Sequence, residues 1–307
     1  MSDKPVVGFI GVGLMGHGMA KNILKGGYPL WVKGNRDRAP VEDLVGQGAQ
    51  EAASPKAMAE ACDIIHLCLS NSPQVEAVMR GEDGILAGAR PGLIVVDCST
   101  ADPASTEALA AELAEKGGAM IDAPLGRTPK EAEEGQLDAM VGADDESFAK
   151  VEPVIQCWAG NINRVGGVGA GHKMKLVMNL ISMSYAALYA EATVLAAKSG
   201  ISPQTVRQVI GSSRLGNGFF DTFMRYAVDR DMEAHKFSIF NGGKDVRYAG
   251  AMAAKVGAPA LISSATRHYF ATAEATGHGA DYVPSLSDRI AEMGGIDLAE
   301  EVKKGEA

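Results

Sequence analysis

The chain is poor in residue types that would point to a metalloprotein or a disulfide-bonded protein. Only four of its 307 residues are cysteines, and no two of them have the CxxC spacing of a zinc ribbon or a thioredoxin motif. None of the six histidines forms an HxxxH pair, so we expect no bound metal. A few reduced thiols are typical of a cytoplasmic protein, and we expect this location.

Basic and aromatic residues are also scarce. Lysine and arginine number 29 against 38 acidic residues, which gives a net charge of −9, and aromatic residues make up 6%. An acidic surface repels phosphate backbones, and few rings are present to stack on bases. We therefore expect no nucleic-acid partner.

Signals for export or membrane insertion are weak. The first residues, MSDKPVVGFIGVG, lack the charged start, long apolar run and cleavage site of a secretory signal. The longest apolar stretch, residues 176–197, is interrupted by polar side chains that a lipid-facing helix would not tolerate, among them Asn179, Ser182 and Glu191. We expect a long helix buried in protein and no membrane partner.

The first half of the chain alternates short β-branched runs with helical segments. Strands are predicted at residues 6–10, 30–33, 64–69, 93–97, 120–122 and 139–142, and helices at 15–25, 54–61 and 103–116. Such alternation is typical of βαβ units. It predicts an α/β fold with a Rossmann-type, doubly wound, mostly parallel sheet.

The second half has helical periodicity. Apolar residues recur at steps of three or four along the 176–197 stretch: Leu176, Leu180, Met183, Ala187, Ala190, Val194 and Ala197. Helices are predicted at about 172–199, 203–210, 222–226, 244–256, 261–276 and 286–293. A glycine-rich stretch at 165–171 predicts a boundary between a nucleotide-binding domain, residues 1–165, and an all-α C-terminal domain, residues 166–307. We expect the charged tail, residues 299–307, to fray.

A glycine motif, Gly11-Val12-Gly13-Leu14-Met15-Gly16, joins the first predicted strand to the first helix. In this context a G-x-G-x-x-G sequence binds the pyrophosphate of a dinucleotide, because the glycines allow a tight turn and a close approach to the helix N-terminus. The alternative is a glycine turn that binds no ligand. We predict that residues 11–15 contact NAD(H) or NADP(H).

The segment after the second strand bears on the choice of cofactor. It reads WVKGNRDR over residues 31–38, with no acidic residue at the strand end to hold the ribose 2′-OH of NAD. Lys33, Arg36 and Arg38 could instead clamp a 2′-phosphate. We assign Asn35 and Arg36 to the cofactor site and favour NADP(H), with NAD(H) possible. The alternative is a solvated charged loop.

Small polar residues follow two further strands. Ser70 and Asn71 come after the third strand, and Thr100 after the fourth. Ligands of doubly wound sheets bind at the carboxyl ends of the strands, so these side chains could contact the nicotinamide ribose. They could equally cap the helices that follow.

A glycine run leads into the long helix and to a lysine, in the pattern Gly167-x-Gly169-x-Gly171-x-x-x-Lys175-x-x-x-Asn179. Lys175 and Asn179 share one helix face, which Ser182 adjoins. A charged lysine could protonate the alkoxide that hydride transfer to a carbonyl would create. The spacing alone fits a surface lysine equally well. For the nearby His172 we favour a helix-start histidine with no chemical role.

Taken together, the motifs resemble the β-hydroxyacid dehydrogenases, the family of 3-hydroxyisobutyrate dehydrogenase. The resemblance rests on four segments: the glycine motif, Asp122-Ala123-Pro124 with Gly135, the glycine–Lys175–Asn179 pattern, and Lys244-Asp245. It implies that Lys175 is the catalytic acid/base, that Asn179 is a partner of the substrate or of the lysine, and that Thr100 and Lys244 lie near the cofactor. It also implies a homodimer or homotetramer with packed helical domains.

The predicted substrate loop departs from the usual family pattern. Where the family has Ser-Gly-Gly after Asp-x-Pro-Val, this chain has Gly126-Arg127-Thr128, which is similar to the sulfolactaldehyde reductases. Arg127 and Thr128 suit a sulfonate, and Ser182 agrees with that subgroup. Arg127 could instead face solvent or the cofactor phosphate. Met178 replaces an asparagine common in the family, which weakens the transfer of individual substrate contacts.

We therefore predict an NAD(P)-dependent oxidoreductase of a small anionic aldehyde, with 3-sulfolactaldehyde as the favoured substrate. The semialdehydes of tartronate, succinate and methylmalonate, the last being the oxidised partner of 3-hydroxyisobutyrate, are the alternatives within the family. A non-catalytic NADP-binding protein is a further alternative, against which the Lys175–Asn179 pair argues. Imine reductases share the architecture but usually replace the lysine.

Overall fold

The computed structural model describes residues 4–34 and 36–306. The chain divides into two compact units, Met1–Lys175 and Leu176–Ala307, each with its own core. The predicted domain boundary, after residue 165, falls at the end of the last strand. It therefore lies earlier in the chain than the division between the two units, which follows Lys175.

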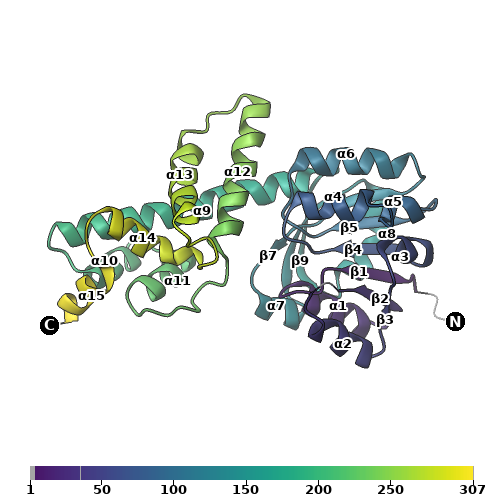
Figure 1. Cartoon of the computed structure of the whole chain (residues 1–307), viewed down its shortest axis with the longest axis horizontal. Helices are drawn as coiled ribbons and strands as arrows, with labels where there is room; N and C mark the ends of the chain where they lie inside the picture. The colour runs from purple at the N-terminus through teal and green to yellow at the C-terminus, as the bar shows by residue number, and fades with distance from the viewer. Residues whose placement is uncertain (1–3, 35, 307) are drawn as a thin grey trace. The chain divides into compact units, whose positions relative to one another are not determined.

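The first unit is built on one mostly parallel sheet, as the sequence predicts (Figure 1). Its strand order is β3-β2-β1-β4-β5-β6-β8, with β7 and β9 each paired to β8. The strands are β1 (Val7–Ile10), β2 (Leu30–Lys33), β3 (Gln50–Glu51), β4 (Ile64–Leu67), β5 (Ile94–Asp97), β6 (Ala119–Asp122), β7 (Leu125–Gly126), β8 (Leu137–Gly142) and β9 (Ala159–Gly166). The order reverses at β1, where β2 lies on one side and β4 on the other.

The end of the sheet that contains β8 is not entirely parallel, unlike the rest of the sheet. β8, the predicted sixth strand, runs antiparallel to β6 and β7. β9 was not predicted, because only Ala159 of its residues is fully buried and no alternating apolar pattern marks it. Nor was β3, which is two exposed residues long.

Helices cover both faces of this sheet (Figure 1). One face packs against α1 (Gly16–Lys25), α2 (Ala39–Gly46) and α8 (Asp145–Ile155), and the other against α3 (Pro55–Ala61), α4 (Ser72–Arg80), α5 (Ile85–Gly88) and α6 (Pro103–Ala114). Strand side chains alternate between the two cores, so Phe9 belongs to the first and Ile10 to the second.

Side-chain caps begin several of these helices where the sequence places a polar residue before proline. The Ser54 hydroxyl accepts a hydrogen bond from Ala57 N at 3.1 Å, and Pro55 occupies the first turn of α3. Asp102 caps α6 in the same way, accepting from Ala104 N at 2.9 Å. These residues satisfy backbone N–H groups that a helix start otherwise leaves unpaired.

The long helix predicted after the glycine run is α9 (Ala170–Lys198), which begins in the first unit and continues into the second. Its predicted apolar stripe is mostly buried, with Leu176, Met183 and Ala190 at 2% exposure or less. Within the described residues it is the one helix long and apolar enough to cross a membrane, and 44% of its most apolar window is buried in protein. A core helix has the same length and composition.

The second unit is helical, as predicted. Its elements after α9 are α10 (Pro203–Gly211), α11 (Gly218–Ala227), α12 (Ile239–Val256), α13 (Leu261–Ala275), the 3₁₀ turn η1 (Val283–Ser285), α14 (Leu286–Met293) and α15 (Leu298–Glu306). Phe220, Phe223 and Phe270 are fully buried at its centre.

The predicted fraying of the tail is wrong for its described part, which is helix α15. Leu298 and Val302 are buried, at 1% and 4% exposure, and so anchor one face of the helix. Ion pairs between Lys303 and Glu300 and between Lys304 and Glu301, each 2.7 Å long, lie along its surface. The tail is so rich in charged residues that its two buried apolar residues form no recognisable pattern in the sequence.

Candidate active site

The register of the sheet aligns the carboxyl ends of β1, β4, β5 and β6. Ile10 pairs with Leu67, Leu67 with Asp97, and Asp97 with Asp122. The segments that follow these residues therefore leave the same edge of the sheet. They include the glycine loop, Ser70 and Asn71, Thr100, and the chain leading to Gly126, as the sequence predicts for a ligand-binding edge.

The glycine loop has the backbone that its sequence implies. Gly11 has φ +97°, and a Cβ there would lie 2.3 Å from the carbonyl oxygen of Cys68, so only glycine fits. A Cβ on Gly13 would meet no atom within 4 Å. The loop is therefore tight at its base and open at its tip, where a phosphate group could approach.

The start of α1 is suited to an anion. Its N-cap residue, Met15, makes no side-chain capping bond, and the first turn contains no acidic residue. This differs from α3, α4, α6 and α8, whose first turns are capped by a serine, asparagine or aspartate side chain. Uncapped N–H groups at a helix N-terminus attract phosphate, so this part of the chain fits a dinucleotide.

Not all of the basic residues at and after the end of β2 are available to bind a 2′-phosphate. Arg38 holds Glu51 of β3 through two hydrogen bonds, of 2.8 and 2.7 Å, and these lower the pKa of the Glu51 carboxyl. Arg36 is exposed, and Lys33 is half-buried at the end of β2. Asn35 lies outside the described residues. The candidates for contact with a ribose phosphate are thus Lys33 and Arg36.

Structural roles account for some of the small polar residues at the edge. The Asn71 side chain caps α4, accepting from Gln74 N at 3.0 Å, and Ser70 N donates to Gln74 Oε1 at 3.1 Å. Thr100 is half-buried in the segment after β5. A cofactor contact is compatible with this capping geometry and remains a prediction.

The predicted substrate loop is strained at its arginine. Arg127 has φ +75°, a conformation that costs a non-glycine residue of order 1–3 kcal/mol. Its Nε lies 3.0 Å from Asp138 Oδ2, and Asn161 donates to the other carboxylate oxygen at 2.7 Å. Although partial burial raises the pKa of Asp138, the bonds from Asn161 and Arg127 outweigh this and lower it. Asp138 thus tethers Arg127 as an ion pair.

The flanking residues of this loop are structurally engaged. Gly126 ends β7, and a Cβ there would lie 3.1 Å from Asp138 Cβ. Thr128 begins α7 (Pro129–Glu134) with a reciprocal cap, in which its backbone N donates to Glu131 Oε2 at 3.0 Å. The cap explains Thr128 without a substrate, and its predicted role in binding stays a prediction.

The start of α9 is tied to the end of β6. Asp122 accepts hydrogen bonds from Gly169 N at 2.6 Å and from His172 N at 2.7 Å. Burial raises the pKa of Asp122, although His172 and these backbone bonds oppose the shift. Lys175, half-buried, follows one turn later, so a buried carboxylate at the ligand edge holds the helix that carries the lysine.

The remaining predicted residues lie in the second unit. Asn179 is buried and donates to Asp245 Oδ2 at 2.6 Å, while Lys244 Nζ lies 3.0 Å from Asp245 Oδ1. Asp245 therefore orients both the amide and the ammonium group from α12. Ser182 Oγ donates to the Asn179 carbonyl at 3.3 Å.

Several residues of this arrangement had no predicted role. Asp122 and Asp245 stand in the segments that carry the family resemblance, and their motif positions are the signal that could have identified them. Asp138 had no such signal, because its link to Arg127 depends on the antiparallel pairing of β7 with β8. The contacts of His172 likewise depend on strands distant in sequence.

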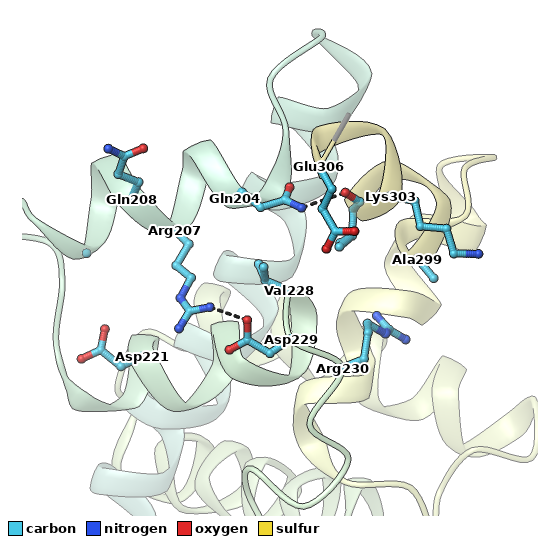
Figure 2. Close-up of a pocket in the computed structure, with 12 residues that line it drawn as sticks. Gln204, Arg207, Gln208, Asp221, Val228, Asp229, Arg230, Ala299, Lys303 and Glu306 are labelled. Carbon is cyan, nitrogen blue, oxygen red and sulfur yellow. Dashed lines mark hydrogen bonds and ion pairs between the residues drawn. The ribbon is translucent and has the colours of Figure 1, made fainter.

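Other candidate sites contribute little. A cavity of about 660 Å³ lies between α10, α11 and α15 and contains no predicted site residue (Figure 2). Its charged groups are partly paired, as in the 2.7 Å contact of Arg207 with Asp229. Within the described residues, no group of three or more histidine, cysteine, aspartate or glutamate side chains is arranged to hold a metal ion.

Comparison with known proteins agrees with this geometry. Residues 6–167 match the NAD binding domain of 6-phosphogluconate dehydrogenase, and residues 169–285 match the family described as NAD-binding of NADP-dependent 3-hydroxyisobutyrate dehydrogenase. The sheet, the open glycine loop and these matches define a pyridine-nucleotide-dependent oxidoreductase.

Relatives along the whole chain narrow the class to one family. The chain is 34% identical to 2-(hydroxymethyl)glutarate dehydrogenase of Eubacterium barkeri, over 97% of this chain and 99% of the relative. It is 31% identical to 3-sulfolactaldehyde reductase of Escherichia coli, over 94% and 97%. The crystal structure of 3-hydroxyisobutyrate dehydrogenase from Salmonella typhimurium superposes with a TM-score of 0.81 at 27% identity, covering 92% of this chain and 98% of that one. The chain belongs to the β-hydroxyacid dehydrogenase family, and the predicted resemblance is confirmed.

Proposed function

We propose that this enzyme reduces a small anionic aldehyde with NADPH, and that 3-sulfolactaldehyde is its substrate. The observation that carries the proposal is Arg127, an arginine in a left-handed backbone conformation, on the loop that follows the ligand edge of the sheet. A residue kept in so costly a conformation is often a functional one.

The geometry of Arg127 supports anion binding. Its Nε is occupied by Asp138, whereas its two Nη nitrogens have no partner among residues 4–34 and 36–306. The Nη groups can donate to two oxygens of a sulfonate or carboxylate at once. The tether to Asp138 reduces the entropy that the side chain would lose on binding.

In the proposed reaction Lys175 is the acid. When bound, the reduced nicotinamide supplies a hydride to the carbonyl carbon of the aldehyde. Lys175 Nζ gives a proton to the carbonyl oxygen, which becomes the hydroxyl of the product. Asn179, held by Asp245, provides an amide oxygen that can accept from the lysine or from the substrate hydroxyl. In the oxidative direction the same proton returns to the lysine.

NADP(H) is the proposed cofactor. No acidic residue ends β2, and Lys33 and Arg36 remain as cations for a 2′-phosphate. Arg38 contributes less than its sequence position implies, because Glu51 occupies both of its terminal nitrogens.

We further propose a homodimer or homotetramer in the cytoplasm. Ile181, Tyr185, Leu188 and Leu195 recur at helical steps on α9 and are 40–70% exposed in the single chain. Such a stripe fits a second helix, here from a second copy. All four cysteines are free thiols, as is typical of a protein in a reducing compartment.

A second candidate is a reductase of a carboxylate-bearing aldehyde. The relative with 34% identity is named for 2-(hydroxymethyl)glutarate, whose oxidised form is an aldehyde with two carboxylates. Arg127 could hold one of them. The semialdehydes of tartronate, succinate and methylmalonate belong to the same chemical class.

A kinetic panel distinguishes these candidates. The kcat/KM of the purified enzyme would be measured for 3-sulfolactaldehyde, 2-formylglutarate and the three semialdehydes, each with NADPH and with NADH. The proposal expects the sulfonate with NADPH to be preferred by at least tenfold over every other combination. A preference for a carboxylate would support the second candidate, and no turnover of any aldehyde would refute both.

A further inference from the structure

Four polar side chains form a buried cluster where α9 begins. Asp97, at the end of β5, Thr106 of α6, Asp122, at the end of β6, and His172 of α9 all have exposures of 1% or less. The cluster lies within the first unit, directly beneath the turn that carries Lys175.

His172 hydrogen-bonds to two of the other members and faces the third. Its backbone N donates to Asp122 Oδ2 at 2.7 Å, and its ring Nδ1 lies 2.8 Å from Thr106 Oγ1. Its Nε2 faces Asp97 Oδ2 at 4.0 Å. Strand β5, strand β6 and helix α6 thus converge on a single side chain in the first turn of α9.

Packing alone does not account for this arrangement. His172 Nε2 and Asp97 Oδ2 are fully buried and have no hydrogen-bond partner among the described residues. Each unpaired buried group costs roughly 1–3 kcal/mol, and apolar side chains of similar volume would avoid this cost. Asp97 and Asp122 each also place a carboxylate oxygen 4.0 Å from a ring nitrogen of His172.

We propose that His172 is a positioning residue for Lys175. The hydrogen bond with Thr106 Oγ1 fixes the imidazole, and the imidazole fixes the rotation of the first turn of α9, from which Lys175 projects three residues later. A proton donor must lie within hydrogen-bond reach of its acceptor, and an error of about 1 Å can cost 10²-fold in rate. This inference rests on the proposed role of Lys175.

Two substitutions separate positioning from stability. His172→Leu keeps the volume and removes the ring hydrogen bond to Thr106, whereas His172→Gln has an amide that can donate to Thr106 Oγ1, whose hydroxyl itself donates to the Asp102 carbonyl. His268, exposed on α13, supplies the control as His268→Leu. The measurements are the midpoint of thermal unfolding, the Kd for NADPH, and kcat and KM for the aldehyde.

If His172 positions Lys175, its replacement should lower kcat and leave the Kd for NADPH nearly unchanged. In His172→Leu we expect kcat to fall about 10- to 100-fold with the Kd for NADPH within twofold of wild type, and in His172→Gln we expect most of the rate to return. The claim is overturned if His172→Leu lowers only the unfolding midpoint, or if His172→Gln is as slow as His172→Leu. Should His172→Leu not fold, Thr106→Val removes one ring contact and is expected to lower kcat in the same direction.

A measurement that does not depend on turnover separates the positioning role of His172 from the proposed function of the enzyme. The rate at which an amine-reactive ester acylates Lys175 in the cofactor-free protein is measured by peptide mass spectrometry, with Lys150 on α8 as internal reference. We expect the ratio of the two rates to change in His172→Leu and to return in His172→Gln. An unchanged ratio overturns the positioning role, even if the wild-type enzyme reduces the aldehyde. A changed ratio in an enzyme that turns over no aldehyde supports positioning while the proposed function fails.

Discussion

At the scale of single residues, the proposed reaction depends on two side chains. In it, Lys175 supplies the proton and Arg127 binds the anionic group of the substrate. Both were candidates in the sequence, but the sequence left open a surface lysine and an arginine facing solvent. The structure adds the tether from Asp138 to Arg127 and the buried carboxylate that caps the start of α9.

Replacing Lys175 with alanine should remove the proton donor. We expect kcat to fall by roughly 10²–10⁴ with little change in the Kd for NADPH. The neighbouring lysine provides the control, because Lys173 makes a 2.6 Å ion pair with Glu107 and Lys173→Ala should retain kcat. Steady-state kinetics at saturating cofactor would show the difference, and equal rates for Lys175→Ala and wild type would exclude the role.

Replacing Arg127 with alanine should weaken substrate binding. We expect KM for the anionic aldehyde to rise about 10- to 100-fold, since hydrogen bonds to charged groups contribute roughly 1.5–3 kcal/mol. Lys130→Ala, on the exposed surface of α7, is the matched control. If both variants kept the wild-type KM, Arg127 would not be the anion anchor.

At the scale of elements, the sequence predicts the main strands and the long helices, but it misses the short strands β3 and β7, strand β9 and the helices α2, α4, α5, α7 and α8. β2 and α14 occupy the predicted ranges, because alternating burial marks β2 and a helical apolar face marks α14. β9 is exposed along most of its length and pairs only with β8, so its existence depends on a partner strand rather than on its own sequence. The candidate site divides in the same way: motifs in the sequence point to Lys175 and the glycine loop as candidates, whereas only the folded sheet brings Asp138 to Arg127.

Strand β4 carries a histidine that should make the first unit sensitive to acid. His66 is fully buried between Phe9 and Trp158, and burial lowers its pKa to about 3 from an ordinary 6.5. Below pH 6.5 the unfolded chain takes up a proton that the folded chain does not. Stability is therefore lost as the pH falls from 6.5 towards 3, by up to roughly 1.4 kcal/mol per pH unit.

The variant His66→Leu isolates this effect. Urea unfolding of both proteins at pH 7.5 and pH 5.0 gives two differences in the free energy of unfolding. We expect the free energy of unfolding of wild type, relative to that of His66→Leu, to be lower by roughly 2 kcal/mol at pH 5.0 than at pH 7.5. A difference that does not depend on pH would show that His66 is not neutral in the folded state.

At the scale of the whole molecule, the exposed apolar stripe of α9 predicts self-association. Light scattering coupled to gel filtration should give a mass of two or four chains. Leu188→Glu places a charge in the stripe and should lower the mass, whereas Val45→Glu, on α2 of the first unit, should not. A wild-type mass of one chain would contradict the proposed oligomer.

The most direct test of the account compares two aldehydes that differ only in the anionic group. The kcat/KM of wild-type enzyme with NADPH is measured for 3-sulfolactaldehyde and for lactaldehyde, which lacks the sulfonate. We expect a ratio of at least about 10² in favour of the sulfonate, because Arg127 can donate two hydrogen bonds to this group and none to lactaldehyde at the same place. Equal values for the two aldehydes would contradict it.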